Sequence, residues 1–356
     1  MGVRLRALHV AAGNGGAPAS EVDTVVTGAP APPSQTDRLR VSAVVCTYTE
    51  ARWGDFVRAV ASLVAQDAPP DQVVVVVDHN GGLLARARAA FTAEVEVIAN
   101  DQQRGLAGAR NAGVHAARGD VIAFLDDDAV ADPGWLRTMM THFADPAVMG
   151  VGGAAKAVWP TDRRPRWLPA EFDWVVGCTH RGLPEAVAPV RNPVGASMAL
   201  RHSLFDVVGG FDTAMGRVGR IPLGCEETEL AVRARQRIPG ASFVHDPGAV
   251  ALHHVSPDRV RLGYFVRRCF AEGLSKAALA RRAGAQDALS SERRYSVVTL
   301  PRAALASLGA VFTGDVAGIA RAVVIVLGVA TAASGYVVGS GRARLARTPR
   351  RDEHRP

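Results

Sequence analysis

The chain has 356 residues, of which 48% are hydrophobic and 21% are charged, and its formal net charge is +7. This composition is typical of one large globular domain or two, with ample length for a core. Residues 342–356 contain six arginines and two acids, so this segment contributes +4 (six minus two) of the charge. The excess of positive charge is therefore partly due to the last fifteen residues of this sequence. It does not indicate a nucleic-acid-binding face, and it favours solvent or anionic lipid as the partner of this tail.

The four cysteines lie far apart in the sequence, at Cys46, Cys178, Cys225 and Cys269. Their spacing matches neither a metal-binding motif nor a redox motif. We therefore predict free thiols in a reducing compartment.

Residues 1–40 are rich in Ala, Gly, Pro, Ser and Thr and contain no apolar run long enough for a signal peptide. We predict a mostly disordered leader there. Apolar runs typical of buried strands then alternate with segments of helical periodicity. Strands are predicted at Val41–Thr47, Val73–Val77 and Val95–Ala99, and helices are predicted from Phe56, over Leu83–Phe91 and over Leu106–Ala117. This order predicts a parallel sheet with helices on both faces, which binds its ligand at the carboxyl edge.

Three consecutive carboxylates, Asp126–Asp128, end an apolar run that begins at Val121. The run is typical of a strand buried on both faces, which places the acids at the ligand-binding edge of the sheet. The following helix has its own start signal in Asp132 and Pro133, so capping does not account for the acids. Adjacent carboxylates raise one another's pKa unless a cation lies between them, and Mg²⁺ binds carboxylate and phosphate oxygens together. The residues indicate either a metal and phosphate site or a solvated acidic turn.

A second acidic cluster, around Glu226 and Glu227, opens a helix predicted over residues 223–237. Acids in a first turn interact favourably with the helix dipole, which by itself is a sufficient structural explanation. Against this explanation, Gly224 leaves backbone room for a ligand beside the two acids.

The loop Trp159–Trp167 interleaves aromatic and guanidinium groups. Tryptophans in an α/β enzyme more often pack in the core or stack on sugars than on nucleic-acid bases. We predict no nucleic-acid partner.

Seven motifs in one order resemble the family 2 glycosyltransferases of the GT-A fold. The resemblance covers about residues 41–260, and its motifs are Cys46-Thr-Tyr-Thr-Glu50, Val77-Asp78, Gly105-Leu-Ala-Gly-Ala-Arg-Asn-Ala-Gly113, Phe124-Leu-Asp-Asp-Asp-Ala129, Gly195-Ala-Ser-Met198, Gly209-Gly-Phe-Asp212 and Gly224-Cys-Glu-Glu-Thr-Glu-Leu230. It implies an α/β fold with a Rossmann-like, mostly parallel sheet that holds a nucleotide-sugar. Six residues are implied as its ligands: Thr47, Tyr48 and Glu50 around the nucleoside, Asp78 at the base, and Arg110 and Asp127 near the ribose and phosphates.

The resemblance also implies a divalent metal, Mg²⁺ or Mn²⁺. Asp126 and Asp128 match the outer positions of the family's metal-binding acidic motif. His253 is similar to the family's late metal-associated histidine, and His254 is the alternative.

The family's catalytic base is the second acid of a Glu-Asp pair, which matches Glu227 here. Because this chain carries Glu where the family has Asp, Glu226 remains an alternative base. Cys46 is a further departure, since proline is common at that position in the family.

The implied activity is that of an inverting hexosyltransferase that moves a sugar to an acceptor hydroxyl or phosphate, and the base takes the proton of a hydroxyl acceptor. The Gln-x-x-Arg-Trp motif of processive members does not follow the acids, which favours transfer of a single sugar. Two alternatives are a nucleotidyltransferase and a catalytically inactive, membrane-tethered sugar-nucleotide sensor. The first lacks support, because residues 47–52 contain no Gly-rich basic loop.

Beyond the motifs, residues 259–295 are basic and helical in pattern. They predict either an amphipathic surface for anionic lipid or a helix packed on the catalytic domain. Two apolar stretches follow, at 297–312 and 316–339, separated by Thr313-Gly-Asp315. The second is long enough to cross a bilayer, but Arg302 weakens a crossing by the first. We predict a shallow or re-entrant hairpin, with helices packed on the soluble domain as the alternative.

The predicted organisation is therefore a leader at 1–40, a catalytic domain at 41–258, a basic helical region at 259–295, an apolar hairpin at 296–340 and a basic disordered tail at 341–356. The catalytic domain divides into a nucleotide-sugar half at 41–145 and an acceptor half at 146–258. The positive-inside rule and a cytosolic nucleotide-sugar pool place the enzyme on the cytoplasmic side of the cell membrane, peripheral or anchored by the hairpin. A membrane location favours a lipid-linked or envelope-glycan acceptor.

Overall fold

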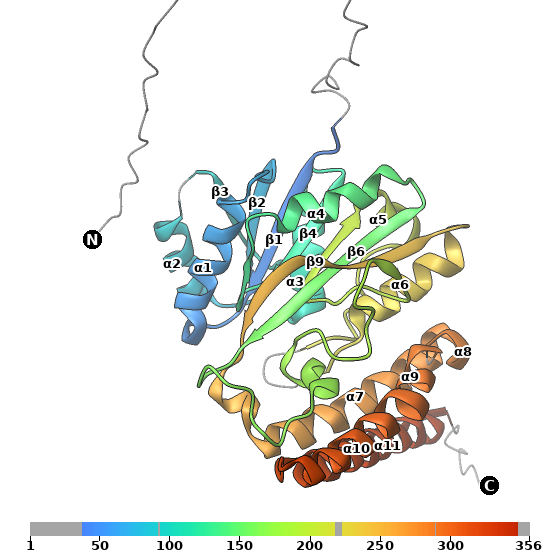
Figure 1. The fold of residues 1–356 in the computed structure, drawn as a ribbon. Coiled ribbons are helices and arrows are strands. Elements are labelled where there is room, and N and C mark those ends of the chain that lie inside the picture. The colour runs from blue at the N-terminus through green and yellow to red at the C-terminus, as the bar shows by residue number, and fades with distance from the viewer. Residues whose placement is uncertain (1–37, 92, 218–222, 289, 348–356) are drawn as a thin grey trace, which may run out of the picture. The chain divides into compact units, whose positions relative to one another are not determined.

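A computed structural model describes residues 38–347, except residues 92, 218–222 and 289. The predicted leader up to residue 37 and the tail from residue 348 lie outside the described residues. The chain from Leu39 onward forms one compact unit around a single nine-stranded sheet. Figure 1 shows this sheet with its flanking helices, and the C-terminal helices lie together below it.

The first half of the sheet is parallel, as predicted. Its strands are β1 (Val41–Thr47), β2 (Gln72–Val77), β3 (Val95–Ala99) and β4 (Val121–Asp126), in the spatial order β3-β2-β1-β4. The connections carry α1 (Trp53–Val64), α2 (Gly81–Ala90) and α3 (Leu106–Ala116). All four strands end at the same edge, so the predicted acidic turn after β4 lies beside the end of β1.

Helices cover both faces of the sheet because side chains alternate along each strand. On β2, Val73, Val75 and Val77 join a core with α1 and α4 (Trp135–Thr141), whereas Val74 and Val76 join a second core with α3, α5 (His202–Val208) and α6 (Glu226–Arg237). Every residue of β2 is buried, which explains why five consecutive valines are tolerated there.

The second half of the sheet is mixed rather than parallel. It contains β5 (Ala129–Ala131), β6 (Val148–Val158), β7 (Ala188–Val190), β8 (Ser197–Arg201) and β9 (Ser242–His254), with α4 (Trp135–Thr141), α5 (His202–Val208) and α6 (Glu226–Arg237) between them. Strand β8 pairs antiparallel with both β4 and β6, and β6 pairs in parallel with β9. Strand β9 thereby carries residues from the far half of the sequence to the edge where β4 ends.

The predicted start of the helix after the acids is wrong by two residues. Helix α4 begins at Trp135, and the backbone N–H of Trp135 donates to the carbonyl of Asp132 at 2.9 Å in a turn. The indole of Trp135 is fully buried and donates to Ser197 Oγ at 2.8 Å. Anchoring of this indole in the core accounts for a helix that starts later than the Asp-Pro signal predicts.

Long helices form most of the C-terminal third. They are α7 (Leu262–Ala283), α8 (Ala285–Ala288), α9 (Ser290–Arg294), a π-helical turn (Tyr295–Thr299), α10 (Leu300–Gly309) and α11 (Ala317–Arg347). Helices lie at both predicted apolar stretches, and α11 continues to Arg347 into the segment predicted as a disordered tail. Short 3₁₀ helices occur at Glu50–Arg52, His142–Ala144, Ala170–Val176, Pro257–Val260 and Ala310–Thr313. All four cysteines are free thiols.

Helix α7 packs closely along α11. A Cβ atom placed on Gly273 would lie 2.0 Å from the carbonyl oxygen of Ala332, and one on Gly335 would lie 2.1 Å from that of Phe270. Phe265 and Cys269 of α7 join Val324 and Ile325 of α11 in a separate core. The basic helix is therefore packed on the rest of the protein, although its outer face also carries arginines.

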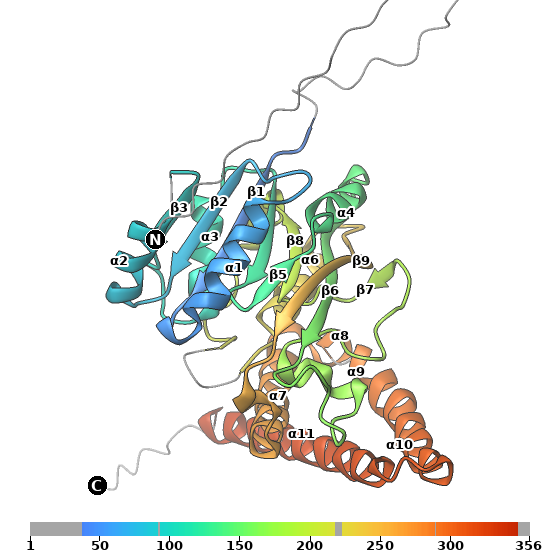
Figure 2. The same ribbon diagram turned by 60° about the vertical axis from the view of Figure 1, so that its left-hand side comes forward.

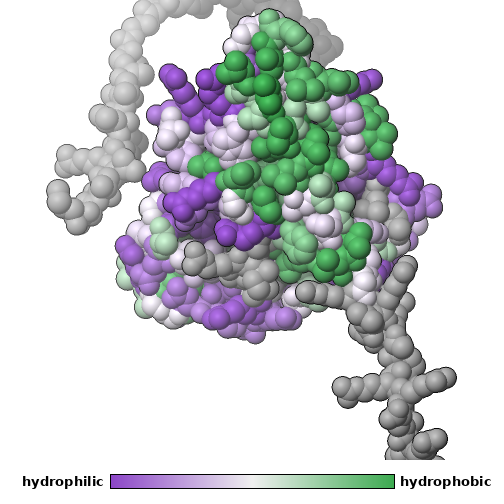
Figure 3. All heavy atoms as spheres, turned by 90° about the horizontal axis from the view of Figure 1, so that it is seen from below, coloured by the Kyte–Doolittle hydropathy of each residue, from purple (hydrophilic) through white to green (hydrophobic). Residues whose placement is uncertain are grey.

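The other face of the C-terminal helices is apolar and exposed. The segments Ser291–Thr313 and Ala317–Gly341 are both long and apolar enough to cross a bilayer, by length and composition. Their exposed side chains include Leu305, Phe312, Ile319, Val323, Val326 and Val337. Figure 3 shows a continuous hydrophobic patch on the face that α10 and α11 form, and Figure 2 shows these two helices diverging from the turn that joins them.

We predict that Gly273→Ala destabilises the protein by about 1–3 kcal/mol, because the added methyl group collides with the backbone of α11. Gly263→Ala, in the same helix, is the matched control, because nothing lies within 4 Å of its Cβ position. Urea unfolding followed by tryptophan fluorescence measures both changes. Equal midpoints for the two variants would contradict the close packing of α7 on α11.

Candidate active site

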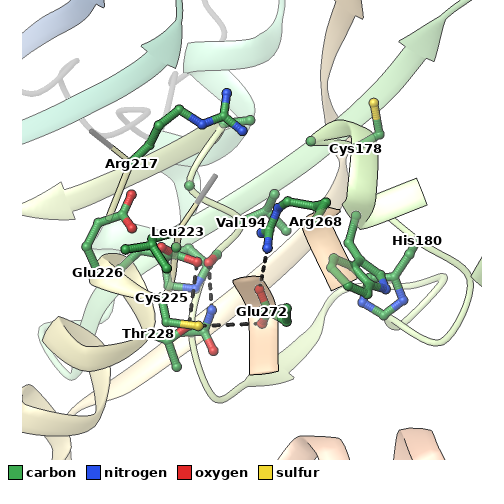
Figure 4. A pocket seen from close by; sticks show the side chains of 18 of the residues that line it. Cys178, His180, Val194, Arg217, Leu223, Cys225, Glu226, Thr228, Arg268 and Glu272 are labelled. Atoms are coloured by element: carbon green, nitrogen blue, oxygen red, sulfur yellow. Dashed lines mark hydrogen bonds and ion pairs between the residues drawn. The ribbon is translucent and has the colours of Figure 1, made fainter. Parts of the chain in front are cut away.

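A single cavity of about 1360 Å³ runs from the carboxyl edge of the parallel strands to the C-terminal helices. Its lining includes Thr47 and Asp128 at the sheet, Glu227 at the start of α6, and Tyr336 on α11. Figure 4 shows charged side chains from different elements, among them Arg217, Glu226, Arg268 and Glu272, gathered around it. The volume exceeds the range of roughly 300–1,000 Å³ usual for one small-molecule ligand, so there is room for two substrates.

Asp127 is held at the end of β1. Its carboxylate accepts a hydrogen bond of 2.7 Å from Thr47 Oγ1 and forms an ion pair of 3.0 Å with Arg52 Nη2. Burial raises the pKa of Asp127 to about 6, although the charge of Arg52 opposes this shift.

Asp128 is surrounded by cationic groups. Its carboxylate lies 2.7 Å from Arg52 Nη1, 3.1 Å from Arg259 Nη2 and 3.1 Å from His253 Nε2. Burial alone would raise the pKa of Asp128, but the charges of His253 and Arg259 outweigh it and hold the pKa well below its usual range. The same contact raises the pKa of His253 to about 10 against the effect of burial. Asp128 and the cationic groups around it therefore hold one another in their charged forms.

Asp126, Asp128 and His253 each offer a ligand atom, and these atoms all lie within 4.8 Å of one another. Strand β9 brings His253 opposite Ala129, directly after the acidic turn. The neighbouring His254 does not belong to this cluster. The two carboxylates suit Mg²⁺ or Mn²⁺, and the imidazole, a ligand of transition metals, favours Mn²⁺ of the two, so the residues fit the implied divalent ion.

The two acids that begin α6 have different environments. Glu226 is buried and forms an ion pair of 2.9 Å with Arg110 Nη1, and Arg110 Nη2 lies 3.5 Å from Asp126. Glu227 is half-buried, lines the cavity and has no ion-pair partner among the described residues. Burial and the charge of Glu226 raise the pKa of Glu227 to about 7. Of the two acids, Glu227 is therefore the one poised to exchange a proton near neutral pH.

The residues predicted to bind the nucleotide-sugar do not all face the cavity. Thr47, Tyr48, Asp78, Arg110 and Asp127 line it. Asp78 accepts hydrogen bonds from Asn100 Nδ2 at 2.7 Å and from the backbone N–H of Gly105 at 3.1 Å, so it also anchors the turn before α3. Glu50, in contrast, is exposed, lies outside the lining and is 3.5 Å from Arg86.

Sequence reasoning missed several cations and a charged cluster. Arg52 and Arg259 both contact Asp128. They lie 76 and 131 residues from it in the sequence (128 minus 52 and 259 minus 128), and no motif marks them. Deeper in the cavity, five charged side chains contact one another: Arg191, Glu292, Lys276, Glu272 and Arg268. Alternating charges on α7 are a local signal, since Arg268, Glu272 and Lys276 follow at four-residue spacing.

The fold and the acidic strand end define an α/β enzyme of the GT-A class. The same fold is found in a mannosyltransferase from Pyrobaculum calidifontis that was solved with GDP-Man and Mn²⁺, at a TM-score of 0.55 and 21% identity, covering 89% of this chain and 90% of that one. Residues 42–209 match the family model described as glycosyl transferase family 2.

Two relatives extend this match. The chain is 34% identical over 241 residues to the glucosyl-dolichyl phosphate glucuronosyltransferase of Haloferax volcanii, covering 67% of this chain and 76% of that protein. It is 29% identical over 157 residues to the pre-mycofactocin glycosyltransferase of Mycobacterium tuberculosis, covering 43% of this chain and 32% of that protein. The chain belongs to glycosyltransferase family 2 and is a glycosyltransferase, as its motifs predict.

We predict that Arg110→Met destabilises the protein by about 3–5 kcal/mol, because it leaves the carboxylate of Glu226 buried without its partner. The double variant Arg110→Met/Glu226→Gln should recover much of this loss. Arg118→Met is the control, since Arg118 is 68% exposed and its ion pair with Glu96 contributes at most about 1 kcal/mol. Denaturant unfolding measures all three, and equal losses for Arg110→Met and Arg118→Met would contradict the role of the buried pair.

Proposed function

We propose that this glycosyltransferase moves one sugar, with inversion, from a nucleotide-sugar to a hydroxyl group of a lipid-linked acceptor. The observation that carries the proposal is the placement of Glu227 in the same cavity as the cluster of Asp126, Asp128 and His253. One group takes a proton near neutral pH, and the other groups suit a metal-bound diphosphate. Both are needed for a direct displacement at the anomeric carbon.

Asp126, Asp128 and His253 would hold the divalent ion of the donor. When bound, such an ion neutralises the diphosphate and makes it a better leaving group. Arg52 and Arg259 already lie against Asp128, so their guanidinium groups are placed to pair with phosphate oxygens beside that carboxylate. Thr47 orients Asp127 and completes the donor side of the site.

Glu227 would act as the catalytic base. Its carboxyl carbon lies 3.6 Å from the Cβ position of Gly195, on the turn before β8, where the absence of a side chain leaves space beside the base. Glu226 is the weaker candidate, because its carboxylate is engaged by Arg110 and a proton taken there would break a buried ion pair. We assign Glu226 to positioning Arg110 against Asp126 and the carbonyl of Gly195.

A lipid-linked acceptor is supported by two independent features. The Haloferax volcanii relative is named for a dolichyl phosphate substrate, and that relative covers most of both chains. The two apolar C-terminal helices expose a hydrophobic face that is suited to the acyl region of a bilayer. We place the enzyme on the cytoplasmic side of the membrane, where the arginines from residue 342 onward satisfy the positive-inside rule.

We predict that Glu227→Gln lowers kcat by about 10²–10⁴-fold, because the amide cannot take the acceptor proton. The donor for this test is chosen by a thermal-shift screen of UDP-, GDP- and dTDP-sugars with Mn²⁺, since binding raises the apparent stability of the folded protein. Glu227→Gln should leave that donor-dependent shift unchanged. In the wild-type enzyme, kcat/KM should fall as the pH decreases through about 7, since protonation of Glu227 removes the base.

Glu226→Gln is the matched variant for this experiment. We expect a smaller loss of kcat, because Glu226 acts through Arg110 rather than on the acceptor. Full activity of Glu227→Gln, together with inactive Glu226→Gln, would reverse the two roles. Product formation with retained anomeric configuration, measured by NMR, would refute the direct displacement.

A further inference from the structure

The cavity extends well beyond the proposed base. From Glu227 it passes along α7 and α9 and reaches α11, where Val329, Ala332, Ala333 and Tyr336 line it. A donor at the acidic turn would occupy only the first part of this length. The lining of the remaining part is first charged and then apolar. A ligand that fills it therefore needs a polar or charged group followed by an apolar group.

The middle of the cavity is lined by five side chains that we call the charged ladder: Arg191, Glu292, Lys276, Glu272 and Arg268. Lys276 Nζ lies 2.6 Å from Glu292 and 3.3 Å from Glu272, and Arg268 Nη1 lies 2.8 Å from Glu272. Figure 4 shows the guanidinium of Arg268 directed at Glu272 beside the cavity. The ladder joins α7, α9 and the segment after β7, so it is part of the architecture and not a flexible surface.

The ladder remains charged although it is largely withdrawn from water. The side chains of Lys276 and Arg268 are 12% and 14% exposed. Burial would raise the pKa of Glu272, but the charges of Lys276 and Arg268 outweigh it and lower the pKa to about 2. The ladder has three cations against two carboxylates, so its N–H groups can donate to phosphate oxygens and its carboxylates can accept from sugar hydroxyl groups.

Aromatic groups flank the ladder on the side of the Ala170–Val176 helix. The indole Nε1 of Trp174 donates to Tyr295 Oη at 3.2 Å, and the ring of His180 packs edge-on against Tyr295. Arg268 lies over the Trp174 ring, 5.3 Å from its centroid. These rings give the middle of the cavity flat apolar walls between its charged groups, a combination typical of sugar-binding sites.

The far end of the cavity is formed by small and apolar residues of the C-terminal helices. Thr299 and Leu300 line it on one side, and Val329, Ala332 and Ala333 line it on the other. Ala333 is exposed and Val329 is 39% exposed, so this end opens onto the outside of α11. The exposed hydrophobic face described above is formed by the same two helices.

We propose that this cavity binds a lipid phosphate lengthwise, with the phosphate at the charged ladder and the apolar tail leaving past Ala333 toward the exposed face of α10 and α11. The proposal rests on the proposed function and names the part of the acceptor that each part of the cavity holds. The sugar of the acceptor lies between the ladder and Glu227, so its hydroxyl reaches the base. The lipid tail stays in contact with apolar surface along its whole path, which avoids exposing it to water.

The experiment measures binding of farnesyl phosphate to the full chain by isothermal titration calorimetry, in one detergent for all variants. Wild-type protein should bind farnesyl phosphate at least about tenfold more tightly than inorganic phosphate, because about 1.4 kcal/mol of tail burial is sufficient for that ratio. Ala333→Trp should weaken farnesyl phosphate binding at least about tenfold by narrowing the exit. Ala320→Trp is the matched control on the same helix, since Ala320 is exposed and does not line the cavity.

Lys276→Gln tests the phosphate end and should weaken both farnesyl phosphate and inorganic phosphate binding. Equal affinity of wild-type protein for the two probes, or equal effects of Ala333→Trp and Ala320→Trp, would overturn the proposal even if Lys276→Gln does not fold. The thermal shift with nucleotide-sugar and Mn²⁺ is recorded on the same samples. If the wild-type protein shows the donor-dependent thermal shift but does not bind farnesyl phosphate, this inference is refuted and the proposed function stands. If it binds farnesyl phosphate but shows no thermal shift with any nucleotide-sugar, the proposed function is contradicted instead.

Discussion

Three carboxylates at the end of β4 are the constraint around which the rest of the structure is arranged. Asp127 and Asp128 are almost completely buried, and burial of uncompensated charge at that density would be strongly unfavourable. Arg52 after β1, Arg110 on α3, His253 on β9 and Arg259 before α7 all contact the triplet. These contacts join the parallel half of the sheet, its mixed half and the C-terminal helices at one point.

The cationic groups that stabilise the buried acids are also suited to a phosphorylated substrate. Residues that neutralise the acids here are basic groups that also suit a diphosphate, so a bound donor would exchange one set of charge partners for another. Glu227 differs from Asp128, whose pKa the surrounding cations hold well below its usual range, because burial and the charge of Glu226 raise the pKa of Glu227 to about 7. Two kinds of acid, one held charged and one poised to change protonation, therefore face one cavity.

Features that depend on local pattern could be predicted from the sequence. The strands of the parallel half, the helices between them and the acidic turn follow from apolar runs and helical spacing, and the structure confirms them. Features that depend on packing between distant parts of the chain could not be predicted from the sequence. The late start of α4 depends on a tryptophan that binds Ser197 in the core, and the antiparallel β8 depends on how the second half of the sheet closes. The motifs marked Asp128 and His253, but nothing in the sequence connects Arg52, Arg259 or the charged ladder to them.

The C-terminal helices line the cavity and also expose an apolar surface. Helix α7 carries Arg268, Glu272 and Lys276 of the ladder and packs against α11, while α10 and α11 expose apolar side chains. An acceptor of the proposed kind, which is part sugar, part phosphate and part lipid, would meet matching surfaces in that order. The sequence predicts either a basic helix that binds lipid or a helix packed on the domain. In the structure α7 is packed, and the exposed apolar surface belongs to α10 and α11.

The central claim is that the acidic triplet is a cation site, and direct measurement of Mn²⁺ binding tests it most simply. Electron paramagnetic resonance counts the Mn²⁺ bound to the full chain in the presence of GDP or UDP. The account predicts about one Mn²⁺ per chain for the wild type and for Asp206→Asn, whose carboxylate is exposed on α5, and an affinity at least about tenfold lower for Asp128→Asn. Equal Mn²⁺ binding by Asp128→Asn and the wild type would contradict it.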